Sequence, residues 1–147
     1  MPQWTEAQQD AIDARGRNII VSAAAGSGKT AVLVERVVRI ITDENHPVDI
    51  DKLLIVTFTN AAAAEMKARI SARMEELLRQ SPGKRQLMRQ LTLLSSAKIC
   101  TIDSFCLNLA RENFFTLGIS QDFSVLDDSE AQIIADNALD TVLDVFY

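Results

Sequence analysis

One short segment places glycines, a lysine and a hydroxyl at a spacing that suits the binding of phosphate groups. Residues 23–30 read Ala-Ala-Ala-Gly-Ser-Gly-Lys-Thr, which matches glycine, four residues and Gly-Lys-Ser/Thr except that Ala23 stands at the first glycine position. Gly26 and Gly28 let the main chain approach an anion closely, and successive N–H groups with a following helix N-terminus can surround it. Lys29 can reach the β- and γ-phosphates, and the Thr30 hydroxyl can bind Mg²⁺. The candidate ligands of a nucleoside triphosphate are therefore Ala23, Ala24, Ala25, Gly26, Ser27, Gly28, Lys29 and Thr30.

The elements around this loop have the order that such a site needs. The β-branched run Asn18–Ser22 predicts a strand before it, and Ala31–Thr42, apolar on all sides, predicts a buried helix after it. Leu53–Thr57 and Ala97–Ile102 predict two more strands, the first without alternation, as expected when both faces are covered. Strands that alternate with helices indicate an α/β fold with parallel strands between two helical layers.

Further helices are predicted from caps and apolar spacing. Thr5 and Gln8 form a capping-box pattern, Asn60 is a candidate cap for a long helix, and a short helix is expected around Leu87–Leu94. Asp103 or Ser104 is expected to cap a helix that runs to about Phe115 and ends before Gly118. Asp128 or Ser129 would begin a last helix in which the chain stops at Tyr147, which suggests a cut chain.

Two segments join a strand end to a helix start, where ligands of open α/β sheets bind. In the first, Thr57-Phe58-Thr59-Asn60, Phe58 can stack on a base, and the hydroxyls with the helix N-terminus suit phosphate contacts. In the second, Thr101–Phe105, the candidates are Thr101, Ser104 and Phe105. For both segments, capping and core packing are the favoured explanations when the residues are considered alone. Gln8 is likewise an ordinary surface glutamine, unless its amide reads an adenine edge.

Composition narrows the class of protein. The chain has 147 residues, 48% of them hydrophobic and 24% charged, which fits one globular domain. The sequence shows neither an apolar run of about 20 residues nor a secretory signal, so we expect a cytoplasmic protein without a membrane partner. Cys100 and Cys106 lack zinc-ligand spacing and are expected to be reduced and packed.

Charge is distributed unevenly although the net charge is only −5. Eight basic residues and two acidic ones lie between Lys67 and Lys98, whereas nine acidic residues and one arginine lie between Asp103 and Tyr147. Two interpretations remain open: solvated helix faces, or a stretch that faces DNA followed by one that faces another surface.

Taken together and in this order, the motifs resemble those of superfamily 1 DNA helicases of the UvrD/RecB group. Gln8 resembles the adenine-reading Q motif, residues 23–30 resemble motif I, and Thr101–Phe105 resembles motif Ib. Thr57–Asn60, with the following Ala62–Met66 and Arg69-Ile70, resembles motif Ia. Within the group, Ile20–Arg36, Leu53–Ile70 and Phe123–Leu126 are most similar to the AddA (RexA) family of bacterial AddAB (RexAB) helicase–nucleases.

The resemblance implies the N-terminal part of a RecA-like P-loop motor domain. Residues 1–115 would belong to the first motor domain (1A), and residues 116–147 would begin an inserted helical subdomain (1B). It further implies ATP and Mg²⁺ as cofactors, single- and double-stranded DNA as partners, a second subunit of the AddB/RexB kind, and a role in double-strand-break repair. The acidic pair that holds Mg²⁺ and activates water in this group is not among these residues, so the chain alone is expected not to hydrolyse ATP.

Two positions depart from the group's pattern. Ala61 stands where many of these helicases carry a lysine, and Asp103 stands where many carry a histidine, so the DNA contacts of those two side chains are not expected here. A nucleotide-gated binding module and another P-loop enzyme without motor activity, such as a kinase, remain alternatives, although the sequence offers no acceptor site for a kinase.

Overall fold

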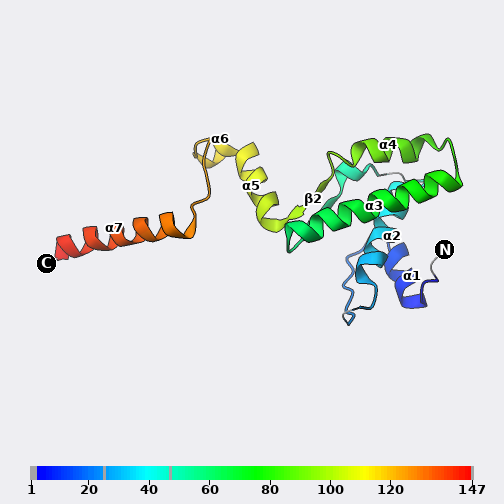
Figure 1. The fold of residues 1–147 in the computed structure, drawn as a ribbon, viewed down its shortest axis with the longest axis horizontal. Coiled ribbons are helices and arrows are strands. Elements are labelled where there is room, and N and C mark those ends of the chain that lie inside the picture. Colours follow the sequence, from blue (N-terminus) through cyan, green and yellow to red (C-terminus); the bar gives the residue numbers. More distant parts are fainter. Residues whose placement is uncertain (1–2, 25, 47, 147) are drawn as a thin grey trace. The chain divides into compact units, whose positions relative to one another are not determined.

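The computed structural model of the chain describes residues 3–24, 26–46 and 48–146. Helices dominate, and the elements in chain order are α1 (Glu6–Asp13), α2 (Lys29–Ile41), the 3₁₀ turn η1 (Ile50–Lys52), β1 (Leu54–Thr57), α3 (Asn60–Gln80), α4 (Arg85–Leu93), β2 (Lys98–Thr101), α5 (Ile102–Glu112), α6 (Phe114–Leu117) and α7 (Asp128–Phe146) (Figure 1). The chain divides into two compact units, the first ending at Cys106 and the second beginning at Leu107.

A small parallel sheet lies in the first unit. β1 pairs with β2 in the register Leu54–Lys98, Ile55–Ile99, Val56–Cys100 and Thr57–Thr101. The connection between them contains α3 and α4, as a parallel pair requires. The predicted α/β class and these two strands are confirmed.

The strand expected over Asn18–Ser22 is not formed, and that prediction was wrong. The segment has no regular structure, and Ile20 is almost completely exposed. A β-strand is stabilised by main-chain hydrogen bonds to a neighbouring strand, and β1 and β2 pair only with each other among the described residues. The β-branched run therefore has the propensity for a strand but no partner.

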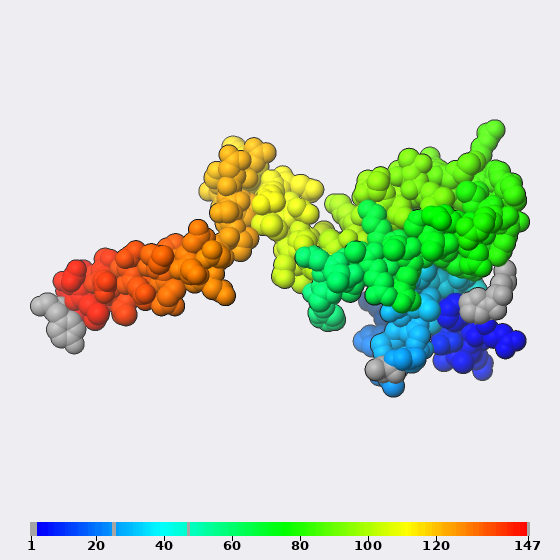
Figure 2. Space-filling view, viewed as in Figure 1, coloured from blue at the N-terminus to red at the C-terminus, as the bar shows by residue number. Residues whose placement is uncertain are grey.

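The core of the first unit lies where α2, α3 and α4 meet the sheet. Its buried side chains come from all of these elements, and the fully buried ones include Val38, Ile41, Ile50, Ile70 and Met74. The helix after the phosphate loop is buried as predicted, with Val34, Val37 and Val38 facing this core. In the space-filling view, α1 packs against α2, and α2 packs against α3 (Figure 2).

Helix caps follow the predicted chemistry but not always the predicted residue. The capping box of Thr5 and Gln8 is present. Thr59, not Asn60, caps α3, since its hydroxyl accepts the Ala62 N–H at 3.1 Å. Thr101, not Asp103 or Ser104, accepts the Ser104 N–H at the start of α5. α7 begins at Asp128, one of the two predicted first residues, and the Asp127 carboxylate before it accepts the Glu130 N–H. At α3 and α5 the oxygen lies one to three residues before the expected position, because a cap must accept from an N–H two or three residues further on.

The second unit is mostly helical and exposes its side chains. The helix predicted to run to Phe115 ends earlier, at Glu112, and α6 follows before Gly118, which adopts a left-handed conformation with φ 66°. The apolar stripe of α7 is exposed, including Leu139 and Phe146. No helix of the described residues is both long and apolar enough to cross a membrane.

Candidate nucleotide and DNA sites

Residues 23, 24 and 26–28 are exposed and lead directly into α2, which begins at Lys29. Gly26 and Gly28 have positive φ angles of 79° and 81°, a conformation that other residues adopt only with strain. A Cβ atom on Gly26 would meet nothing within 4 Å, so the loop leaves open space beside its main chain. The candidate Ala25 lies outside the described residues.

Lys29 holds the loop closed through its own side chain. Its ammonium group donates hydrogen bonds to the main-chain carbonyls of Ala23 at 2.7 Å and Ala24 at 2.8 Å. Ser27 N–H also donates to Ala24 O at 3.3 Å. The Lys29 ammonium group therefore lies against the main chain at the start of this loop.

The first turn of α2 offers donors for an anion. Gly28 precedes the helix, and within the described chain no side chain forms a capping hydrogen bond there. The first N–H groups of an α-helix have no partner inside the helix, and the helix dipole places partial positive charge at the same end. Together with Lys29 and the exposed Thr30 hydroxyl, this donor set fits a nucleoside triphosphate with its divalent cation.

Gln8 contacts this loop from α1. Its Nε2 donates to Ser27 O at 3.2 Å, and its Oε1 accepts the Thr5 N–H at 3.0 Å. The same Nε2 would lie 3.6 Å from a Cβ on Gly28. An amide nitrogen carries two hydrogens and its oxygen two lone pairs, so one of each remains available to a ligand. Although 19 residues separate Gln8 from Ser27 in the chain, the structure places the two candidate nucleotide contacts together.

Arg36 fixes the other end of α1. Its guanidinium donates to the carbonyls of Ala11 at 2.7 Å and Ile12 at 3.3 Å, and Arg15 donates to Ile12 O at 2.7 Å. The cations satisfy carbonyls at the C-terminus of α1, where the dipole is negative. Burial is the main cause that lowers the pKa of Arg36 from its ordinary value, and the positive charge of Arg15 lowers it further. Arg36 thus attaches α1, and Gln8 with it, to the helix that follows the loop.

The two candidate DNA segments meet at the carboxyl end of the sheet. Thr57 and Thr101 are register partners, so the segments that follow them begin side by side. The Thr57 hydroxyl donates to Thr59 O at 2.9 Å, and the Thr101 hydroxyl donates to Ser104 Oγ at 2.8 Å. Because Thr101 is buried and already bonded, its role is to hold the turn.

The remaining candidates differ in accessibility. Phe58 is fully exposed, Asn60 is exposed, and Ser104 and Phe105 are half-buried. Capping and packing account for Thr59, Ser104 and Phe105, whereas neither accounts for Phe58. No hydrogen bond among the described residues joins this strand-end group to the loop at residues 23–30.

Half of the basic residues between Lys67 and Lys98 form ion pairs within the fold. Four of its eight basic residues pair with carboxylates, as Arg69–Glu65, Arg73–Glu35, Lys84–Glu44 and Arg89–Asp49. For these four residues, ion pairing within the fold explains the charge pattern better than contact with DNA does. The thiols of Cys100 and Cys106 are free; Cys100 is half-buried, but Cys106 is exposed, so the expectation that both are packed was wrong for Cys106.

Sequence reasoning missed the charged residues inside the helix that follows the loop. Glu35 is buried between two arginines, Arg39 and Arg73, and Arg36 holds α1. The available signal was the spacing of Glu35 and Arg39 by four residues, which places both on one helix face. A carboxylate among valines on a buried helix face is also a signal, because burial of an unpaired charge is costly and therefore indicates a cation from another element.

Comparison with known proteins identifies the family of the chain. The UvrD/REP helicase N-terminal domain family matches residues 4–145, and the chain belongs to that family. Its relatives include A subunits of bacterial ATP-dependent helicase/nucleases. The chain is 52% identical over 145 residues to the one from a Thermoanaerobacter species and 51% identical over 145 residues to the one from Acetivibrio thermocellus, with 99% of this chain covered in both. The protein of the same name from Bacillus licheniformis is 49% identical over 144 residues. The chain spans only 12% of the length of each of these relatives.

Proposed function

We propose that this chain is the ATP-binding front part of a DNA helicase motor, within a helicase–nuclease of the AddA kind. The observation that carries the proposal is the start of α2: Gly28 and Lys29 lead into the helix, and Gln8 of α1 contacts the same loop through Ser27. An anion site built from a loop and a helix N-terminus is the arrangement of P-loop enzymes. Family membership over residues 4–145 supports the same conclusion.

The fold we propose is a RecA-like P-loop domain with three layers. β1 and β2, with their helical crossover, would be two of its parallel strands. Residues 1–115 would form part of domain 1A, and residues 116–147 would begin subdomain 1B. The apolar stripe of α7 is exposed. An apolar helix face normally packs against another element, so the stripe supports the proposal that α7 belongs to a larger helical subdomain.

Each nucleotide-site residue has a definite role in this proposal. Lys29 would exchange its bonds to Ala23 and Ala24 for the β- and γ-phosphates and stabilise negative charge there. Thr30 would hold the Mg²⁺ ion, which neutralises charge that develops on the phosphates. Gln8 would read the adenine edge with its free donor and acceptor. The main-chain N–H groups of residues 23–30 would bind the remaining phosphate oxygens.

DNA would bind at the carboxyl end of the two strands. Phe58 is the residue we assign to base stacking, since it is fully exposed and nothing in the fold requires an aromatic there. Thr57, Thr59 and Asn60 would contact phosphates together with the N-terminus of α3, and Thr101, Ser104 and Phe105 would shape the neighbouring turn.

In the whole protein, ATP hydrolysis would drive movement along single-stranded DNA and unwinding of duplex ends in double-strand-break repair. The relatives are named as one lettered subunit of a helicase/nuclease, which supports a second subunit of the AddB/RexB kind. Such a protein would work in the cytoplasm. The chain alone is expected to bind ATP without turning it over, because the acidic pair for hydrolysis is not among its residues.

Calorimetry with Mg·ATP and Mg·ADP tests the proposal. Saturable binding to the wild-type chain, lost or weakened at least roughly 10-fold in Lys29→Ala, is expected from removal of one charged contact to phosphate. Lys52→Ala removes an exposed lysine of η1 and serves as the matched control. Absence of binding to a folded chain, and again to a longer chain with the acidic strand, would contradict the proposal.

A nucleotide-gated binding module without motor activity is the alternative. It has the same loop and the same calorimetric result, but it predicts that the full-length protein hydrolyses ATP no faster when single-stranded DNA is present. Stimulation of hydrolysis by DNA therefore separates the two.

A further inference from the structure

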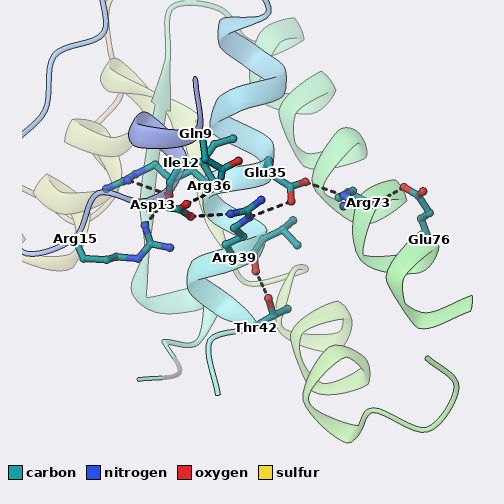
Figure 3. Close-up of polar contacts among 11 residues, drawn as sticks. Gln9, Ile12, Asp13, Arg15, Glu35, Arg36, Arg39, Thr42, Arg73 and Glu76 are labelled. Atoms are coloured by element: carbon teal, nitrogen blue, oxygen red, sulfur yellow. Dashed lines mark hydrogen bonds and ion pairs between the residues drawn. The ribbon is translucent and has the colours of Figure 1, made fainter. Parts of the chain in front are cut away.

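A chain of ion pairs crosses the three helices α1, α2 and α3 of the first unit. It runs from Asp13 of α1 to Arg39 and Glu35 of α2 and on to Arg73 and Glu76 of α3 (Figure 3). Asp13 and Arg39 meet at 2.7 Å, and Arg73 and Glu76 meet at 2.8 Å. Within this chain of contacts, the link from α2 to α3 is made by Glu35.

Glu35 divides its carboxylate between two helices. Its Oε1 accepts from Arg39 Nε of the same helix at 3.3 Å, and its Oε2 accepts from Arg73 Nε of α3 at 2.9 Å. Glu35 is only 7% exposed, and the Arg73 side chain only 14%. The hydrogen bond that Arg73 donates to Glu35 is the main cause that raises the pKa of Arg73 above its ordinary value. Both oxygens are therefore fixed in direction by different donors.

This contact determines position more than it adds stability. Removing two charges from water costs about as much free energy as their attraction returns, so a buried pair is a weak source of net stability. Apolar side chains also pack between α2 and α3, with Val34 and Val38 in one core with Ile70 and Met66. Apolar contacts have no direction, whereas a paired carboxylate holds donor and acceptor within a few tenths of an ångström. Glu35 and Arg73 therefore fix how far along its axis one helix lies beside the other.

The two helices carry the two proposed ligand sites at their N-terminal ends. α2 begins with Lys29 and Thr30, and α3 begins directly after Phe58 and Thr59. A movement of α2 when the loop closes on phosphates would reach α3 at the contact of Glu35 with Arg73, where donor and acceptor are fixed in direction. We propose that Glu35, held by Arg39 and paired with Arg73, is a positioning residue that couples nucleotide binding at the loop to DNA binding at the start of α3. This inference rests on the proposed function.

α3 also supplies a matched control. Glu75 is an exposed carboxylate that accepts a hydrogen bond from the Ser71 hydroxyl at 3.0 Å within the helix. It lies on the same helix as Arg73 but outside the stretch that resembles motif Ia, and this contact connects no second element. Loss of the Glu75 charge therefore tests whether any carboxylate contact on α3 matters, or only the one that joins α2.

The test is made in the full-length protein, from the affinity for a single-stranded oligonucleotide with and without Mg·AMP-PNP. The ratio of the two dissociation constants measures the coupling, which is typically about 5- to 150-fold. In Glu35→Gln the ratio should fall towards one, while the dissociation constant for Mg·AMP-PNP without DNA stays within about twofold of wild type, because Glu35 touches no ligand. kcat of DNA-stimulated hydrolysis should fall with KM for ATP nearly unchanged. Glu75→Gln should behave as wild type.

A double-mutant cycle separates this role from general destabilisation. If Glu35 and Arg73 act as one contact, Arg73→Gln should lose the coupling as Glu35→Gln does, and the double variant should lose no more. Should Glu35→Gln fail to fold, Arg73→Lys, which keeps the charge but has one donor group for two carboxylates, should show a reduced ratio. A folded Glu35→Gln or Arg73→Lys protein that retains the wild-type ratio overturns the inference, as does a wild-type ratio of one. A wild-type protein that binds no nucleotide overturns the proposed function instead.

Discussion

The side-chain amide of Gln8 donates to the main-chain carbonyl of Ser27 at 3.2 Å, and so joins α1 to the loop before α2. The opposite end of α1 is held by Arg36 of α2. A glutamine that closes a capping box in its own helix thereby also reaches the loop that we assign to the phosphates. The contact brings the base-reading and phosphate-binding candidates of the proposed site within one structural unit.

Substitution of Gln8 should change which base is preferred more than it changes phosphate binding. Gln8→Ala removes the free donor and acceptor, so we expect Mg·ADP affinity to fall by roughly 10-fold, about the value of one or two neutral hydrogen bonds. The preference for ADP over GDP should largely disappear. Calorimetry with both nucleotides measures this. Gln9→Ala, the adjacent residue on α1, is the control, and an unchanged ADP preference in Gln8→Ala would contradict the adenine assignment.

Phe58 should matter for DNA and not for stability. Its side chain is fully exposed, so Phe58→Ala is expected to leave the unfolding midpoint unchanged. Loss of one stacked base should weaken single-strand affinity of the full-length protein by about 1–3 kcal/mol, which corresponds to roughly 5- to 150-fold. Fluorescence anisotropy with a labelled oligonucleotide measures it. Phe115→Ala, another exposed phenylalanine, is the control. Equal affinity of wild type and Phe58→Ala would disprove the stacking role.

The sequence predicted features that depend on neighbours in the chain. Three predicted local patterns are present: the start of α2 at Gly28-Lys29-Thr30, the capping box of Thr5 and Gln8, and the strands β1 and β2. The position of Gln8 at the loop also agrees with the resemblance, although the contact with Ser27 spans 19 residues of sequence.

The failures depend on partners that a sequence does not display. Residues 18–22 have strand propensity, but a strand needs a neighbour to pair with, and β1 and β2 leave none for it in the described part of the chain. The pairing of Glu35 with Arg73 joins residues 38 positions apart, so the spacing within α2 shows only that Glu35 can meet Arg39. Charge pattern alone could not tell the bonded arginines of α3 and α4 from free ones.

The cap of α3 provides a test of local energetics. The Thr59 hydroxyl accepts the Ala62 N–H, so Thr59→Ala should destabilise the chain by about 1 kcal/mol, within the usual range of about 0.5–2 kcal/mol for an N-cap. Asn60→Ala, one residue later and inside the helix, should change stability by less than about 0.5 kcal/mol. Urea unfolding followed by circular dichroism compares the two. A larger loss for Asn60→Ala would mean that Asn60 is the true cap.

Acid should destabilise the first unit through carboxylates that are hydrogen-bonded in the folded state. The Arg89 guanidinium, followed by the Gln90 amide, holds the pKa of Asp49 below its ordinary value of 3.8. The N–H groups of His46 and Asn45 lower the pKa of Asp43, and the Gln9 amide, followed by a smaller effect of Arg39, lowers that of Asp13. A carboxyl group whose pKa is lowered in the folded state stabilises the fold fully when the pH is above its pKa in the unfolded chain, about 3.9. This stabilisation is lost as the pH falls through the pKa of the folded state.

The unfolding midpoint should therefore be nearly constant from about pH 7 to pH 5 and fall steeply below about pH 4. Asp49→Asn removes one of the three titrating groups, so its midpoint should start lower at neutral pH and fall less on acidification. Thermal unfolding of both proteins between about pH 7 and pH 3 measures the difference. Asp122→Asn, an exposed carboxylate of the second unit, should keep the wild-type slope. Parallel curves for wild type and Asp49→Asn would show that the contacts of Asp49 with Arg89 and Gln90 do not persist in solution.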